Sequence, residues 1–173
     1  MSLTDIVRFG IAAIATGVLA WAAVSDIRTR RIPNWCVAAL LGLYVPWALT
    51  GDWLGVLSGL EAATIGLVVT FALYAFKILG AGDSKLFAAC ALFAGMGFLP
   101  YLALATSLVG GLVALVSIVT RPRRALVMLT MRGEGDFGRG IPYGVAVSAA
   151  AAIVIWAPLA GVLHPYAYGH TVP

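Results

Sequence analysis

Charge is scarce in this sequence of 173 residues. Lysine, arginine, aspartate and glutamate together make up 10% of the chain, whereas apolar residues make up 62%. Soluble domains carry about 25% charged and about 45–50% apolar residues. A soluble fold of this size cannot bury so much apolar surface, so lipid has to cover part of it. The composition therefore excludes an ordinary soluble enzyme and predicts an integral membrane protein.

Clustered cysteines and basic nucleic-acid platforms are also missing. The two cysteines, Cys36 and Cys90, both lie in apolar runs, and the sequence has no CxxC motif and no Cys/His cluster. This spacing argues against a zinc site and gives no support to a structural disulfide. The net charge is +4, but the basic residues are scattered among apolar segments. We therefore expect neither a bound metal nor a nucleic-acid partner.

Long runs with little or no charge cover most of the chain, at 9–25, 35–51, 54–76, 86–120 and 143–163. A membrane-spanning helix needs about 20 apolar residues, so four of these runs fit one crossing each. The run 86–120 would form roughly 52 Å of helix, which exceeds a bilayer core of about 30 Å. Its middle reads GMGFLPY, a Gly/Pro cluster typical of a turn. We therefore predict a hairpin near 95–100 and six transmembrane helices.

The basic residues predict how these helices are oriented. If the chain starts outside, the inside loops are 26–34, 77–85 and 121–142, and they hold ten of the eleven basic residues. Only Arg8 lies elsewhere, which is the asymmetry that the positive-inside bias predicts. The predicted fold is an all-α, polytopic membrane helix bundle. It forms a single domain over residues 1–173, with six transmembrane helices and both termini outside.

Two acidic residues fall at the same depth in this topology. Asp26 ends the first helix and Asp83 precedes the fourth, so both lie at the inner mouth of the bundle. Two carboxylates within a few ångströms share one proton, which allows general acid–base chemistry on a peptide bond. Gly80 and Gly82 carry no side chains and would let a substrate strand approach closely. From the residues alone the alternative stays open that the aspartates only cap helices and that Lys85 is an interface anchor.

Three motifs resemble those of one known family. GAGDSKL (80–86) resembles the GxGD signature of the type IV prepilin peptidases, which are membrane aspartic proteases. DIRTRRIPN (26–34) resembles that family's other aspartate block, and IPYG (141–144) resembles its Pro-[FY]-Gly element before the last helix. The order of the motifs, the six-helix layout and the chain length agree as well. The compact layout is similar to that of the Flp/Tad-type members and to that of the archaeal preflagellin peptidases, and of these two we favour the bacterial Flp/Tad type.

The resemblance implies which residues act and on what. It implies catalytic aspartates at Asp26 and Asp83, and substrate-binding or supporting positions at Gly80, Gly82, Lys85, Pro142 and Gly144. The implied reaction removes the short basic leader from a prepilin or pseudopilin precursor at the cytoplasmic face of the bacterial inner membrane. The pilus assembly machinery is then a further partner. We expect no cofactor, because the N-terminal region of the larger, bifunctional peptidase/N-methyltransferase members has no counterpart here.

Other classes of protein were weighed against this interpretation. A presenilin-like protease would share only the GxGD element, and its Pro-Ala-Leu element is absent from the sequence. A non-enzymatic membrane scaffold of a pilus or secretion assembly would use the same aspartates as helix caps. A small transporter would carry ionisable groups near the membrane midplane, and only Glu61 is a candidate. The peptidase remains the prediction that accounts for all three motifs.

Overall fold

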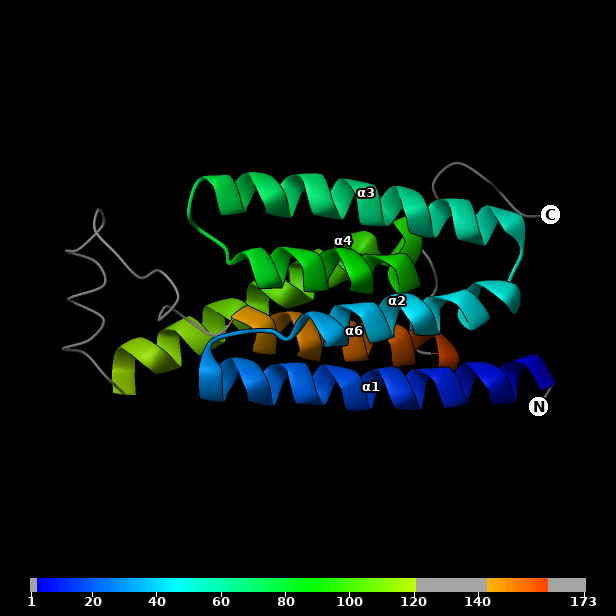
Figure 1. The fold of residues 1–173 in the computed structure, drawn as a ribbon, viewed down its shortest axis with the longest axis horizontal. Helices are drawn as coiled ribbons and strands as arrows, with labels where there is room; N and C mark the ends of the chain where they lie inside the picture. Colours follow the sequence, from blue (N-terminus) through cyan, green and yellow to red (C-terminus); the bar gives the residue numbers. More distant parts are fainter. Residues whose placement is uncertain (1–2, 121–142, 162–173) are drawn as a thin grey trace.

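The computed structural model describes residues 3–120 and 143–161, and within them it contains only helices. These are α1 (Leu3–Thr29), α2 (Asn34–Leu49), α3 (Trp53–Ala75), α4 (Ala81–Thr120) and α6 (Tyr143–Leu159). The helices lie roughly side by side (Figure 1). The C-terminal ends of α1 and α3 and the starts of α4 and α6 are at one end of the bundle, which we call the inner end. The prediction of an all-α helix bundle is confirmed for this part of the chain.

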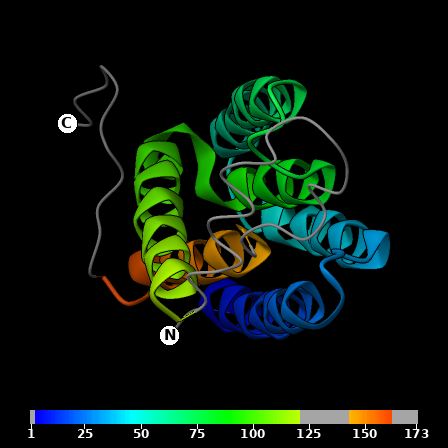
Figure 2. The same ribbon diagram turned by 90° about the vertical axis from the view of Figure 1, so that its left-hand side faces the viewer.

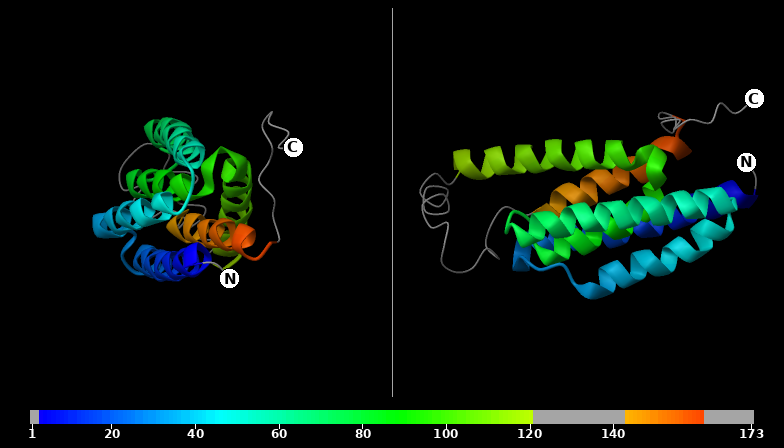
Figure 3. Two further views of the ribbon diagram at one scale, coloured as in Figure 1. Left: turned by 90° about the vertical axis from the view of Figure 1, so that its right-hand side faces the viewer. Right: turned by 90° about the horizontal axis from the view of Figure 1, so that it is seen from above.

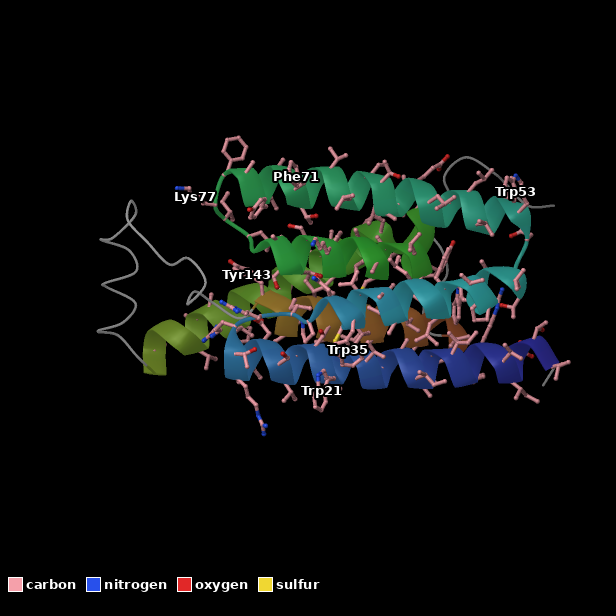
Figure 4. The ribbon with its side chains drawn as sticks, in the orientation of Figure 1. Trp21, Trp35, Trp53, Phe71, Lys77 and Tyr143 are labelled. Carbon is pink, nitrogen blue, oxygen red and sulfur yellow. The ribbon has the colours of Figure 1, made fainter. Side chains whose placement is uncertain are left out.

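Three of the described helices are long and apolar enough to cross a membrane, namely α1, α3 and the Ala81–Val116 part of α4. Helices α2 and α6 are apolar but shorter, with 16 and 17 residues. Large apolar side chains are exposed along α3 and the second part of α4, among them Leu54, Val68, Phe71, Leu104, Leu108 and Leu115. The side chain of Phe71, labelled on α3 in Figure 4, is 60% exposed. The structure thus supports a membrane protein, whereas six crossings and two outside termini stay predictions.

Helix α4 consists of two helical stretches that meet at Gly95. The φ and ψ angles of Gly95 are 61° and 177°, a combination that essentially only glycine adopts. The two stretches run in opposite directions, as Figure 3 shows from above. Ser58 of α3 stabilises the break, because its Oγ accepts a hydrogen bond of 2.9 Å from the backbone N–H of Met96. The turn predicted near 95–100 corresponds to this reversal.

Helix α6 occupies the centre of the bundle. Figure 2 shows it enclosed by α1 and the two stretches of α4, and it packs against both helices. Most of its buried residues are alanine, valine or glycine, whose small side chains let helices approach closely. At its far end, Nε1 of Trp156 donates a hydrogen bond of 2.9 Å to Oγ1 of Thr16 on α1. This contact helps to hold α6 in register with α1.

A left-handed residue follows the end of both α1 and α3 at the inner end, directly after Thr29 in α1 and after the cap residue Phe76 in α3. Arg30 has a φ of 56° and donates its N–H to the carbonyl of Asp26 at 3.0 Å, while Lys77 has a φ of 58°. A left-handed residue directly after a helix ends it and redirects the chain. The two turns lead the chain into the links before α2 and α4, and these links carry Ile32 and Gly80. Local backbone conformation thus sets where both links begin.

The substitution Gly95→Ala tests the reversal within α4. We expect it to lower the free energy of unfolding by about 1–3 kcal/mol, because alanine disfavours the observed backbone angles. Its methyl group would also lie 3.0 Å from Oγ of Ser58. Gly111→Ala in the same helix is the matched control, since a methyl group there meets nothing within 4 Å. Thermal unfolding in detergent compares the two, and equal melting temperatures would contradict a conformational role for Gly95.

Candidate active site

Asp26 lies in the last turn of α1, on the face that packs into the bundle. It continues a buried stripe at helical spacing, formed by Ala15, Leu19 and Ala22, so the helix itself turns the carboxylate inward. Only 6% of the residue's surface is exposed. A carboxylate buried to this extent needs hydrogen-bond donors, and the neighbouring helix α6 supplies them.

The start of α6 binds the Asp26 carboxylate. Oδ2 of Asp26 accepts a hydrogen bond of 2.9 Å from the backbone N–H of Gly144, and the N–H of Val145 interacts with the same carboxylate. The first N–H groups of a helix have no partner within the helix, so Asp26 caps α6 from another helix. The start of α6, where the helix dipole is positive, therefore lies at the carboxylate of Asp26.

Gly144 has to be small for this contact to form. A methyl group at this position would lie 2.8 Å from Oδ2 and 3.0 Å from Cγ of Asp26. Contacts this short between non-bonded atoms would force α6 away from α1 or turn the carboxylate out of place. The sequence predicted Gly144 as a supporting residue, and the structure gives a physical reason for a glycine there.

Asp83 lies in the first turn of α4, three residues after Gly80. Its Oδ2 accepts a hydrogen bond of 3.3 Å from the backbone N–H of Gly80. This is half of a capping box, in which a side chain of the first turn binds the N–H of the cap residue. A methyl group at Gly80 would lie 2.8 Å from Oδ2 of Asp83, so this glycine is also required to be small. Asp83 thus contributes to the cap of α4, as the helix-cap alternative supposed, and this contact uses its Oδ2.

The two carboxylates lie close enough for their charges to repel each other. The side chain of Ile32 lies next to the residues that flank both carboxylates. On the side of Asp83, a methyl group at Gly82 would lie 3.4 Å from Cβ of Ile32. A methyl group at Gly144 would lie 2.9 Å from Cδ1 of the same isoleucine. The predicted residues that the structure brings to this part of the inner end are Asp26, Asp83, Gly80, Gly82 and Gly144.

Ser84 is part of this arrangement and was missing from the sequence prediction. It is buried, and its Oγ donates a hydrogen bond of 3.0 Å to the backbone carbonyl of Thr70 on α3. This bond fixes the first turn of α4, and with it Asp83, against α3. The signal for it is a hydroxyl residue directly after the aspartate in a first helical turn, a place where serine commonly bonds to backbone groups.

Two predicted site residues stand apart from this group. The side chain of Lys85 is exposed, as expected of an anchor at the membrane surface. Pro142 lies outside the described residues. In the described part of the chain, no three His, Cys, Asp or Glu side chains come together in a way that would hold a metal ion.

A comparison of the sequence with known protein families gives a match that covers α2, α3 and large parts of α1 and α4. The type IV leader peptidase family matches residues 13–115, a segment that contains both Asp26 and Asp83. The chain belongs to the type IV leader peptidase family. Membership makes it a protease, and the resemblance to the prepilin peptidases is confirmed at the level of the family. No curated protein and no solved structure matches the chain.

The substitution Gly144→Ala tests the contact between α1 and α6. The family resemblance implies that Asp26 is catalytic, and the added methyl group would displace its carboxylate. If so, we expect at least a tenfold loss of leader peptidase activity, because small displacements of reacting groups cost up to about 100-fold in rate. Gly17→Ala on α1 is the matched control, since a methyl group there meets nothing within 4 Å. Cleavage of a leader-bearing precursor measures both variants. Full activity of Gly144→Ala would show that the observed contact is dispensable.

Proposed function

We propose that the chain is an aspartic endopeptidase that removes the short basic leader from prepilin or pseudopilin precursors. Family membership supports the leader peptidase activity. The single observation that supports the aspartic type is that Asp26 and Asp83 come from separate helices to one end of the bundle, where Ile32 lies against both Gly82, next to Asp83, and Gly144, which binds Asp26. No cofactor enters the proposed reaction.

The hydrogen bonds suit a pair of carboxylates that works with one proton. Oδ2 of Asp26 accepts a hydrogen bond from the N–H of Gly144, and Oδ2 of Asp83 accepts one from the N–H of Gly80, so each carboxylate is held by a main-chain donor. The ionised carboxyl group takes a proton from water as the water oxygen attacks the scissile carbonyl carbon. The protonated one binds the carbonyl oxygen and then gives its proton to the leaving amine. Because a coupled pair titrates as a unit, neither role is assigned to one aspartate.

The position of the pair along the bundle fits a substrate held in the membrane. The exposed rings of Trp21 and Trp35 lie 6.3 Å apart, and Trp53 lies at the opposite end (Figure 4). Tryptophans at two levels are typical of the two membrane interfaces. Asp26 lies beyond Trp21 towards the inner end of α1, where a precursor whose apolar helix stays in the bilayer would present its scissile bond. Confinement to one plane replaces much of the search in solution.

We also propose the finer topology that the sequence predicts. The six crossings would be α1, α2, α3, the two stretches of α4 and α6, with both termini outside. The reversal at Gly95 supports counting α4 twice. The described basic residues at the inner end support a cytoplasmic location for the carboxylates in a bacterial inner membrane; these are Arg30, Arg31 and Lys77 in the links and Lys85 near the start of α4. Within the family we favour the compact Flp/Tad type.

The substitutions Asp26→Asn and Asp83→Asn test the aspartic mechanism. We expect each to abolish processing of a co-expressed precursor, because an amide neither accepts the proton from water nor donates one to the amine. Asp52→Asn is the matched control: this aspartate caps α3 through Gly55 at 3.0 Å, and asparagine is an equally good cap. A size shift of the precursor on a gel measures processing. Normal processing by both active-site variants would favour the scaffold alternative.

The substitution Lys77→Cys tests the orientation, because Lys77 is exposed in the link between α3 and α4. We expect a membrane-impermeant maleimide to label it in inverted vesicles and not in intact spheroplasts. Trp53→Cys at the opposite end of α3 should show the reverse pattern, and it serves as the control. The native cysteines Cys36 and Cys90 are buried and should give little background. Labelling of Lys77→Cys from outside would overturn the proposed topology.

A further inference from the structure

Ile32 is an isolated apolar residue in the basic link between α1 and α2. Its neighbours are Arg31 and Pro33, and its own side chain is half-buried against the core. The backbone holds it from both sides. The carbonyl of Arg31 accepts a hydrogen bond of 2.9 Å from Oγ of Ser25, and Pro33 has an extended backbone with a φ of −63° at the cap position of α2. The side chain is therefore presented from a fixed position.

The side chain of Ile32 lies between two helices, and its Cδ1 is near both of them, because a methyl group at Gly82 would also lie 3.8 Å from Cδ1. Cβ of Ile32 faces Gly82 at the start of α4, where a methyl group would come within 3.4 Å. Cδ1 faces Gly144 at the start of α6, where a methyl group would come within 2.9 Å. Both neighbours are glycines, so the isoleucine touches backbone on each side. The width of one side chain thus separates the first turns of α4 and α6.

The first turn of α4 carries one of the two carboxylates, and the first turn of α6 binds the other. Gly82 directly precedes Asp83, and Gly144 donates the hydrogen bond of 2.9 Å to Oδ2 of Asp26. A change in the width of the side chain between the turns therefore changes the distance between the carboxylates. We propose that Ile32 is a positioning residue that sets the spacing of Asp26 and Asp83 for catalysis. This proposal rests on the proposed function, in which the two aspartates form the catalytic pair.

Isoleucine is well suited to this role. Its β-branched side chain is restricted at χ1, so the direction in which Cγ1 and Cδ1 extend from the backbone is held more firmly than in an unbranched side chain. Truncation to alanine removes the contact with α6 and leaves a gap that the two first turns or water can fill. Because reacting groups displaced by about 1 Å lose up to about 100-fold in rate, such a gap would act on catalysis more strongly than on folding.

Cleavage kinetics of three variants test the proposal. We expect Ile32→Ala to lower kcat by about 10- to 100-fold with KM changed less than about twofold. Ile32→Val, which keeps both branches at Cβ and loses only Cδ1, should retain more activity than alanine. Ile78→Ala is the matched control, because Ile78 lies in the other inner link and is 56% exposed. Parental kcat in both Ile32 variants would overturn the positioning role, and so would a loss confined to KM.

A second measurement reads the spacing without catalysis. In a Cys36→Ala/Cys90→Ala background, the pair Asp26→Cys/Asp83→Cys is cross-linked with a series of bis-maleimides of increasing length. With isoleucine at position 32 we expect one preferred length, and with Ile32→Ala a shifted or broadened preference. An unchanged preference would overturn the proposal even if activity falls. If the parent chain processes no precursor but the preference shifts, the spacer role stands and the proposed function fails.

Discussion

At the inner end of the bundle, the buried carboxylate of Asp26 accepts a hydrogen bond from the N–H of Gly144. The carboxylate needs a donor and the first N–H groups of α6 need an acceptor, so each group supplies what the other lacks. The two residues lie 118 positions apart, and the bond between them closes the inner end of the bundle. Loss of this bond would leave a buried acceptor and a buried helix N–H each short of one hydrogen-bond partner, which costs about 1–3 kcal/mol for each group. The close approach of α1 and α6, the glycine at 144 and the narrow space beside Ile32 all follow from this one contact.

Bringing Asp83 near a charge of the same sign requires a rigid support, and α3 provides it. The first stretch of α4 is bound to α3 at both of its ends. At the inner end Oγ of Ser84 donates to the carbonyl of Thr70, and at the reversal Oγ of Ser58 accepts from the N–H of Met96. Helix α3 exposes large apolar side chains such as Val68 on its outer face, so it is both a lipid-facing helix and the brace of α4. Repulsion between the carboxylates thus acts against a fixed helix.

Much of the fold followed from the sequence because it depends on local patterns. Apolar runs predicted the helices, Gly95 lies in the predicted turn, and the motifs drew attention to Asp26, Asp83 and Gly144. The contacts of the site did not follow, because they depend on packing between distant segments. Helical spacing places Asp26 on the buried stripe of α1, but nothing local names Gly144 as its donor. Ile32 and Ser84 stood inside the quoted motifs without a role, since their partners belong to other helices.

Glycine has two separate physical functions in this bundle. One concerns the backbone conformation of α4, and the other concerns the geometry of the candidate active site. At Gly95 the requirement is conformational, because the backbone angles are those that other residues avoid, and the contact concerned is with Ser58 on α3. At Gly144 the requirement is space inside a regular helix, and the contact concerned is with Asp26. The donors that hold the carboxylates are main-chain N–H groups, so any residue except proline would supply them. Since every such residue has the donor, its side chain decides how closely the carboxylate can approach. Glycine at positions 80 and 144, which donate to Asp83 and Asp26, is therefore a geometric condition for the proposed reaction.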